Sequence, residues 1–155
     1  MSPRQRLLSA LAGQRLDRLP TQISFTPLAA EQAAGWLGVA ASDLPFVLGN
    51  HVVDVFVNPI ERVEGSTSFD LWGVGWDNAA NDGFQIDVHP LADRGQLSRY
   101  RFPDPNDDRF YTDIAEQIAR NNGYRAIFAD IGFTLWERYY LLRGFEPAME
   151  DLALN

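Results

Sequence analysis

The sequence predicts an α/β fold in which parallel strands alternate with helices and a β-hairpin is inserted between them. Short runs rich in β-branched residues alternate with stretches that carry apolar residues at helical spacing, a pattern typical of parallel sheets. Residues 78–83 are rich in Asn, Asp and Gly and separate two extended segments, as the turn of a hairpin does. The length of 155 residues fits one domain.

Capping residues and glycines mark the helices. Ser2 and Pro3 suit the N-cap and the first position of the first helix, and Thr26 with Pro27 repeats this arrangement before the second. Together with apolar periodicity, these signals predict helices over residues 3–12, 27–37, 42–48, 109–121, 134–142 and 146–154.

The core strands are expected near residues 21–25, 51–57 and 124–128. The second is dense in valine, typical of a largely buried strand, and is stopped by Asn58 and the proline that follows it. The hairpin insertion is expected from extended pieces within residues 69–89.

These strands are few for a chain of this length. Three strands cannot close a barrel, and a parallel sheet needs both of its faces covered. The chain also stops at Asn155 inside a predicted helix. We therefore expect residues 1–155 to be one incomplete domain of a larger, truncated fold. Its open strand edges and apolar interior predict self-association, or a partner chain that supplies the second half.

Composition excludes several classes of function. The 13 basic side chains are all arginine and face 21 acidic ones, and the resulting charge of -8 argues against a nucleic-acid partner. Without cysteine the chain has no disulfide, thiolate metal site or cysteine nucleophile, and without lysine it has no Schiff-base chemistry. No apolar run approaches 18 residues, and the basic start lacks a signal-type apolar segment. We expect a cytoplasmic protein that does not insert into a membrane.

The common catalytic and metal signatures are absent. The sequence holds no G-x-S-x-G, G-x-G-x-x-G or H-E-x-x-H motif. Its two histidines, His51 and His89, have no partner at metal-ligand spacing, so we expect no metal site. A turn hydrogen bond is the ordinary role for His89, which precedes a proline.

Candidate binding residues lie at the carboxyl ends of the expected strands, where α/β sheets place ligands. Aromatic pairs such as Trp72 and Trp76 are candidates for the walls of a flat apolar site. Helix capping, turn formation and core packing are the structural alternatives for all of these side chains. The residues that we single out for substrate binding are Phe25, Asn58, Asp70, Trp72, Asp130 and Tyr139.

The chain also resembles the N-terminal half of the uroporphyrinogen decarboxylase superfamily, which includes cobalamin-dependent methyltransferases. Four segments carry the resemblance in the same order along the chain, namely RQRLLSALAGQRLDRLP, FDLWGVGW, HPLADRGQLSRYRFPDP and GFTLWERYYLLRGFEPAMEDLA. They are closer to the decarboxylase-like and methyltransferase-like members than to the haem-pathway enzyme. The resemblance implies the first half of a (β/α)8 TIM-type barrel with a hairpin insertion, and a ligand cleft at the carboxyl ends of its strands.

Several family motifs are altered here. The arginine-rich stretch that grips substrate carboxylates corresponds to residues 25–30, which contain no arginine. The aspartate that binds pyrrole N–H groups corresponds to Asn58, and an amide lacks the charge to stabilise a pyrrolic cation. The family tyrosine after an F-T-L segment falls on Arg138, next to Tyr139. The zinc ligands of the methyltransferase branch have no counterparts in this chain.

Two functions follow as alternatives. The resemblance implies a tetrapyrrole-related carboxy-lyase, or a methyltransferase that takes a corrinoid as substrate, with catalysis incomplete in this chain alone and no bound cofactor expected. The second reading is a non-catalytic remnant or binding module that retains an aromatic cleft. The catalytic residues stay unassigned in both.

Overall fold

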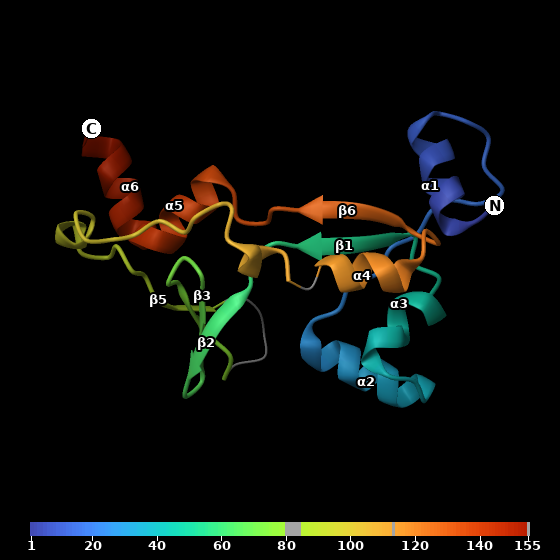
Figure 1. Ribbon diagram of the computed structural model, residues 1–155, viewed down its shortest axis with the longest axis horizontal. Helices are drawn as coiled ribbons and strands as arrows, with labels where there is room; N and C mark the ends of the chain where they lie inside the picture. The colour runs from blue at the N-terminus through green and yellow to red at the C-terminus, as the bar shows by residue number, and fades with distance from the viewer. Residues whose placement is uncertain (80–84, 113, 155) are drawn as a thin grey trace. The chain divides into compact units, whose positions relative to one another are not determined.

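The computed structural model describes residues 1–79, 85–112 and 114–154 and divides them into two compact units (Figure 1). Unit 1 comprises Met1–Phe56 and Tyr111–Asp130, and unit 2 comprises Val57–Phe110 and Ile131–Asn155. Each unit thus combines two stretches that are far apart in the sequence. Each is described separately below.

Unit 1 consists of four α-helices around a two-stranded parallel sheet. Its elements are α1 (Pro3–Leu11), α2 (Pro27–Leu37), a 3-10 turn (Ala41–Asp43), α3 (Leu44–Val47), β1 (Val52–Phe56), α4 (Ile114–Asn121) and β6 (Ala126–Asp130). The capping predictions for the first two helices are confirmed. Ser2 forms a capping box with Gln5, the Thr26 hydroxyl accepts from the Ala29 amide, and Gly38 ends α2 with φ +68°.

The parallel strands agree with the α/β prediction. β1 pairs with β6 in parallel, and Val52 to Phe56 lie opposite Ala126 to Asp130 (Figure 1). The strand expected over residues 51–57 is confirmed, and the one expected over 124–128 lies two residues further along. The helix expected over residues 109–121 is shorter than predicted, because a separate 3-10 turn over Asp108–Phe110 precedes α4; residue 113 lies outside the described part of the chain.

The strand expected over residues 21–25 was wrong. These residues run extended beside the start of β1, where one backbone hydrogen bond joins the His51 amide to the Thr21 carbonyl and side chains make the other contacts described here. Asn50 Oδ1 accepts from the Ile23 amide at 3.1 Å, and its Nδ2 donates to the Ile23 carbonyl at 2.8 Å. The Val52 amide donates in turn to Gln22 Oε1 at 3.2 Å. The backbone groups of Ile23 are thus satisfied by a side chain and not by a strand ladder.

Unit 2 is built on a four-stranded antiparallel sheet. Its elements are β2 (Ile60–Glu64), β3 (Thr67–Asp70), β4 (Gly75–Asp77), β5 (Gln85–Val88), two 3-10 turns (Arg94–Gln96 and Asp108–Phe110), α5 (Leu135–Arg143) and α6 (Phe145–Leu154). The antiparallel pair β4 and β5 corresponds to the expected hairpin, although residues 80–84 of its turn lie outside the described residues. β2 was not predicted.

The core of unit 2 lies between this sheet and α5. Val74, Trp76, Leu91, Leu141 and Leu142 are buried together, and Trp76 stacks on Phe133 with ring centroids 5.1 Å apart. These contacts join the sheet to a helix that begins more than 40 residues after the last strand of the sheet.

The two sheets support the predicted α/β class but not the predicted half-barrel. The described residues are mixed α/β, with one parallel pair of strands and one antiparallel sheet, and they form no closed barrel. The half of a TIM-type barrel therefore stays a prediction that rests on the resemblance, since only β1 and β6 pair as successive barrel strands do.

Candidate functional site

Three of the predicted site residues meet in unit 2 around Arg138. The Arg138 Nη1 group donates to Asp70 Oδ2 at 3.2 Å, and Nη2 donates to Asn58 Oδ1 at 3.2 Å. Its Cζ atom lies 4.6 Å from the centre of the Trp72 ring. Asn58 follows β1, Asp70 ends β3, and Arg138 belongs to α5, so the tertiary fold brings together side chains up to 80 residues apart.

Hydrogen bonds within this Arg138 cluster occupy the Asp70 carboxylate, whereas the Arg138 Nε–H makes none within the described residues. Asp70 is fully buried and also accepts from the backbone amides of Trp72 and Val74 and from the Trp76 indole. Burial lowers the pKa of the Arg138 guanidinium, while Asp70 acts in the opposite direction. A carboxylate that accepts from four donors, one of them a cation, has little hydrogen-bonding capacity left for a ligand. The cluster therefore ties the sheet to α5.

The remaining predicted residues lie elsewhere. Tyr139 donates to Asp151 Oδ2 at 3.1 Å, in a group of contacts between α5 and α6 that also includes Arg143. Asp130 ends β6, opposite Phe56 of β1. Phe25, in contrast, lines a cavity of unit 1.

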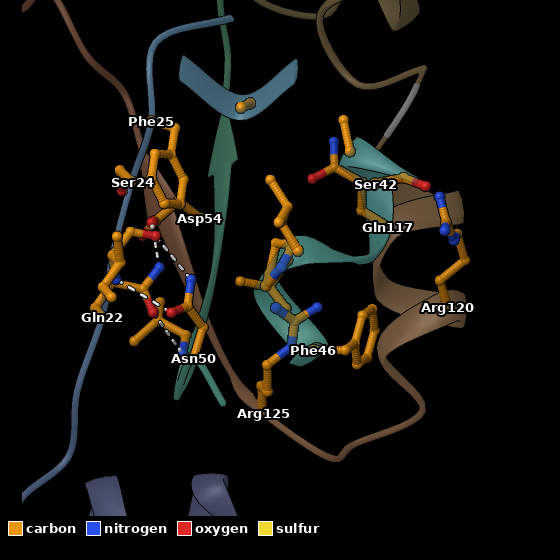
Figure 2. A pocket seen from close by; sticks show the side chains of 17 residues that line it. Gln22, Ser24, Phe25, Ser42, Phe46, Asn50, Asp54, Gln117, Arg120 and Arg125 are labelled. Carbon is orange, nitrogen blue, oxygen red and sulfur yellow. Dashed lines mark hydrogen bonds between the residues drawn. The ribbon is translucent and has the colours of Figure 1, made fainter. Parts of the chain in front are cut away.

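The cavity of unit 1 has a volume of about 390 Å³. It lies against β1 and is bordered by the extended segment before it, by α3 and by α4 (Figure 2). Figure 2 shows Asp54, Gln22 and Asn50 on one side of it and Ser42, Gln117 and Arg120 on the other. The Arg125 side chain extends between the two groups beside Phe46. A volume near 400 Å³ lies at the lower end of the range for small-molecule sites.

Arg125 is fixed from behind by Asn121, the last residue of α4. The Arg125 amide donates to Asn121 Oδ1 at 3.0 Å, and Asn121 Nδ2 donates to the Arg125 carbonyl at 2.8 Å. Between them Asn122 and Gly123 have φ values of +45° and +71°, a left-handed turn that favours asparagine and glycine. This turn places Arg125 directly before β6, with its backbone held at two points.

The guanidinium of Arg125 has no counter-charge among the residues that the structure describes. The residue is only 6% exposed, and its Nε–H makes no hydrogen bond within the described residues. Its Cζ atom lies 4.1 Å from the centre of the Phe46 ring, a cation–π contact. Burial lowers the pKa of Arg125, and no carboxylate of the described chain acts in the opposite direction. In this respect it differs from Arg138, which has Asp70.

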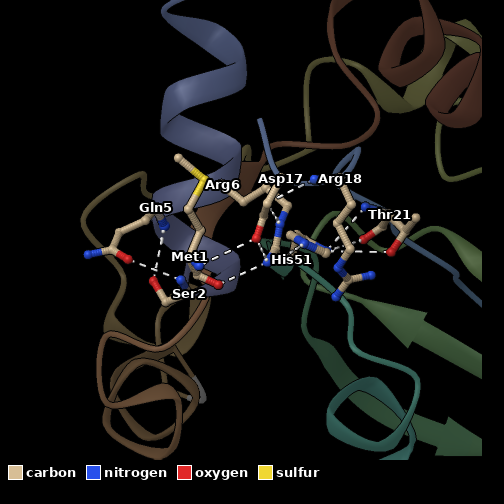
Figure 3. A network of polar contacts seen from close by, with 8 residues as sticks. All are labelled: Met1, Ser2, Gln5, Arg6, Asp17, Arg18, Thr21 and His51. Atoms are coloured by element: carbon tan, nitrogen blue, oxygen red, sulfur yellow. Dashed lines mark hydrogen bonds and ion pairs between the residues drawn. The ribbon is translucent and has the colours of Figure 1, made fainter. Parts of the chain in front are cut away.

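A polar network next to the cavity holds its extended wall in place (Figure 3). Arg6 of α1 binds both oxygens of Asp17 at 2.7 and 2.8 Å and contacts His51 Nε2 at 2.8 Å. Because Arg6 can only donate, His51 Nε2 accepts, and the proton on Nδ1 donates to the Thr21 carbonyl at 2.9 Å. The Arg6 guanidinium holds the pKa of the Asp17 carboxyl well below its usual range. Thr21 and His51 directly precede Gln22 and Val52 of the cavity wall.

Sequence reasoning missed the cavity because it examined the carboxyl ends of the strands. Asn50 and Arg125 instead precede β1 and β6, so the cavity reaches their amino ends. The one available signal was a charged residue directly before a buried-type strand, with no acidic residue within four positions on either side. Such a position suggested a strand boundary and nothing more.

Comparisons of the chain with family models, with curated protein sequences and with solved structures found no match. Within residues 1–79, 85–112 and 114–154, no group of three or more His, Asp or Glu side chains is arranged to hold a metal ion. No helix of this part of the chain is both long enough and apolar enough to cross a membrane.

Proposed function

We propose that this chain binds a small organic carboxylate in the cavity of unit 1. The observation that carries the proposal is the Arg125 guanidinium, which is buried at the cavity without a carboxylate partner. A planar guanidinium presents pairs of N–H donors that match the two oxygens of a carboxylate. The ligand would supply the counter-charge that the described chain leaves out.

The free-energy balance supports this reading. A fully buried charge without a partner destabilises a fold by several kcal/mol. One cation–π contact offsets only about 0.5–2 kcal/mol of this cost. Asn121 nevertheless holds the Arg125 backbone with two hydrogen bonds, so the side chain is directed into the cavity by the fold. A positioned but unpaired cation is the arrangement expected of an anion-binding residue.

A tetrapyrrole-related function, as implied by the family resemblance, is the second candidate. It is favoured by Phe25, a residue predicted for substrate binding that does line the cavity. Tetrapyrroles carry carboxylate arms, so Arg125 would hold one arm while the macrocycle stayed outside a space of about 390 Å³. Titration with coproporphyrin, followed by its visible absorbance, separates the two candidates. Tight binding of coproporphyrin but of no small carboxylate would favour the tetrapyrrole.

The test of the main proposal is calorimetric titration of the full chain with a panel of small carboxylic acids. We expect Arg125→Gln to weaken binding at least tenfold, because a charge-assisted hydrogen bond contributes about 1.5–3 kcal/mol. The matched control is Arg15→Gln, which removes the same charge from an exposed side chain of unit 1 that does not line the cavity. Equal affinity in the wild type and in Arg125→Gln would refute the proposal.

A further inference from the structure

A second charge borders the same cavity. Asp54 belongs to β1, is solvent-exposed and lines the cavity on the side opposite Arg120 (Figure 2). Its Oδ2 atom accepts from Gln22 Nε2 at 3.2 Å, and it forms no ion pair within the described residues. Gln22 is itself fixed, because its Oε1 atom accepts from the Val52 amide. The Asp54 carboxylate is thus oriented without being neutralised.

Among the described residues that line the cavity, Asp54 and Arg125 are an anion and a cation that each form no ion pair. Arg120 lies 3.9 Å from Asp43, so it has a carboxylate of its own. Arg125 and Asp54 line the same space of about 390 Å³ and yet form no ion pair with each other. Opposite charges that line one cavity without pairing create a local electric field between them. A ligand with a single charge would neutralise only one of them.

We infer that the ligand is a zwitterion, which places its carboxylate on Arg125 and an ammonium group on Asp54. The inference rests on the proposed function and adds the second end of the ligand. Apolar side chains also line the cavity, Ile23, Phe25, Leu44 and Phe46 among them. An amino acid with an apolar or aromatic side chain combines these three features in a molecule of suitable size.

The experiment compares ligands that differ only in the ammonium group. L-phenylalanine is titrated beside 3-phenylpropionate, and L-leucine beside 4-methylpentanoate, into wild-type protein, Asp54→Asn and Arg125→Gln. The control variant is Glu31→Gln, since Glu31 is exposed on α2 and does not line the cavity. Asp54 is exposed and makes one side-chain hydrogen bond, so the Asn substitution leaves the fold intact.

We expect each amino acid to bind wild-type protein about tenfold more tightly than its deaminated counterpart, as a charge-assisted contact predicts. Asp54→Asn should abolish this preference without weakening the binding of the deaminated acids, because it removes an anion from the cavity. Glu31→Gln should alter neither quantity.

The experiment distinguishes failure of the zwitterion inference from failure of the proposed carboxylate binding. If both members of each pair bind equally to wild-type protein, and Arg125→Gln weakens both, the zwitterion is wrong and carboxylate binding stands. If Arg125→Gln weakens neither member, the proposed function is wrong as well. If neither amino acid binds at millimolar concentration, the inference is overturned, and the carboxylate panel alone decides the proposed function.

Discussion

Replacing Arg125 by methionine should stabilise the ligand-free protein. The guanidinium is buried, and its Nε–H has no acceptor among the described residues. Its contact with the Phe46 ring offsets part of the free-energy cost of burying the charge. The unmade hydrogen bond costs about 1–3 kcal/mol, and the cation–π contact offsets about 0.5–2 kcal/mol. Exchanging buried ionic groups for apolar ones of similar volume is neutral or stabilising by about 1–4 kcal/mol. Methionine keeps the length of the side chain and a favourable sulfur–aromatic contact.

We therefore expect Arg125→Met to raise the free energy of unfolding by about 1–2 kcal/mol while removing the carboxylate site. Urea denaturation without ligand measures the first effect, and calorimetric titration measures the second. The control is Arg120→Met, where the side chain is 54% exposed and the change should stay within about 0.5 kcal/mol. A lower stability of Arg125→Met without ligand would refute the reasoning, because it would mean that the guanidinium already has a stabilising partner.

Three further predictions concern the fold. Burial, reinforced by Asp70, raises the pKa of Tyr100 to about 12, so the folded state favours the neutral phenol. Stability that is constant below pH about 9 should therefore fall by about 2 kcal/mol toward pH 11.5. Tyr100→Phe should lack this loss in urea titrations, and an identical loss would contradict the assignment. Asp70→Asn should destabilise the protein by about 3 kcal/mol by leaving Arg138 buried without its counter-charge, and an unchanged urea midpoint would argue against that ion pair. Gly75→Ala should lower the free energy of unfolding by about 1–3 kcal/mol, because the added Cβ atom would lie 2.8 Å from Val88. Gly35→Ala should raise it by up to about 1 kcal/mol, because Gly35 lies in the interior of α2 with open space around it. Equal thermal midpoints for the two alanine variants would contradict the close approach at Gly75.

The candidate site divides into a part that the sequence predicted and a part that it could not. Asn58, Asp70 and Trp72 were singled out and do meet, but around Arg138, whose role in joining them depends on the packing of α5 against the sheet. Hydrogen bonds within the cluster occupy the Asp70 carboxylate, and no sequence pattern states whether a polar group is already satisfied. Arg125 went unnoticed for the same reason, since its significance lies in the partner that it lacks.

What the sequence determined by itself is local. Ser2, Thr26 and the glycines set the ends of the first helices, and the β-branched run after His51 set β1, because caps and side-chain periodicity act within a few residues. The tertiary structure alone decided that residues 21–25 lie beside β1 without becoming a strand, since Asn50 competes for their backbone groups across 27 residues of chain. It also decided that Arg125 and Asp54 share one cavity without pairing. Burial and the absence of a counter-charge are properties of the packed chain, and they arise only when distant segments exclude water together.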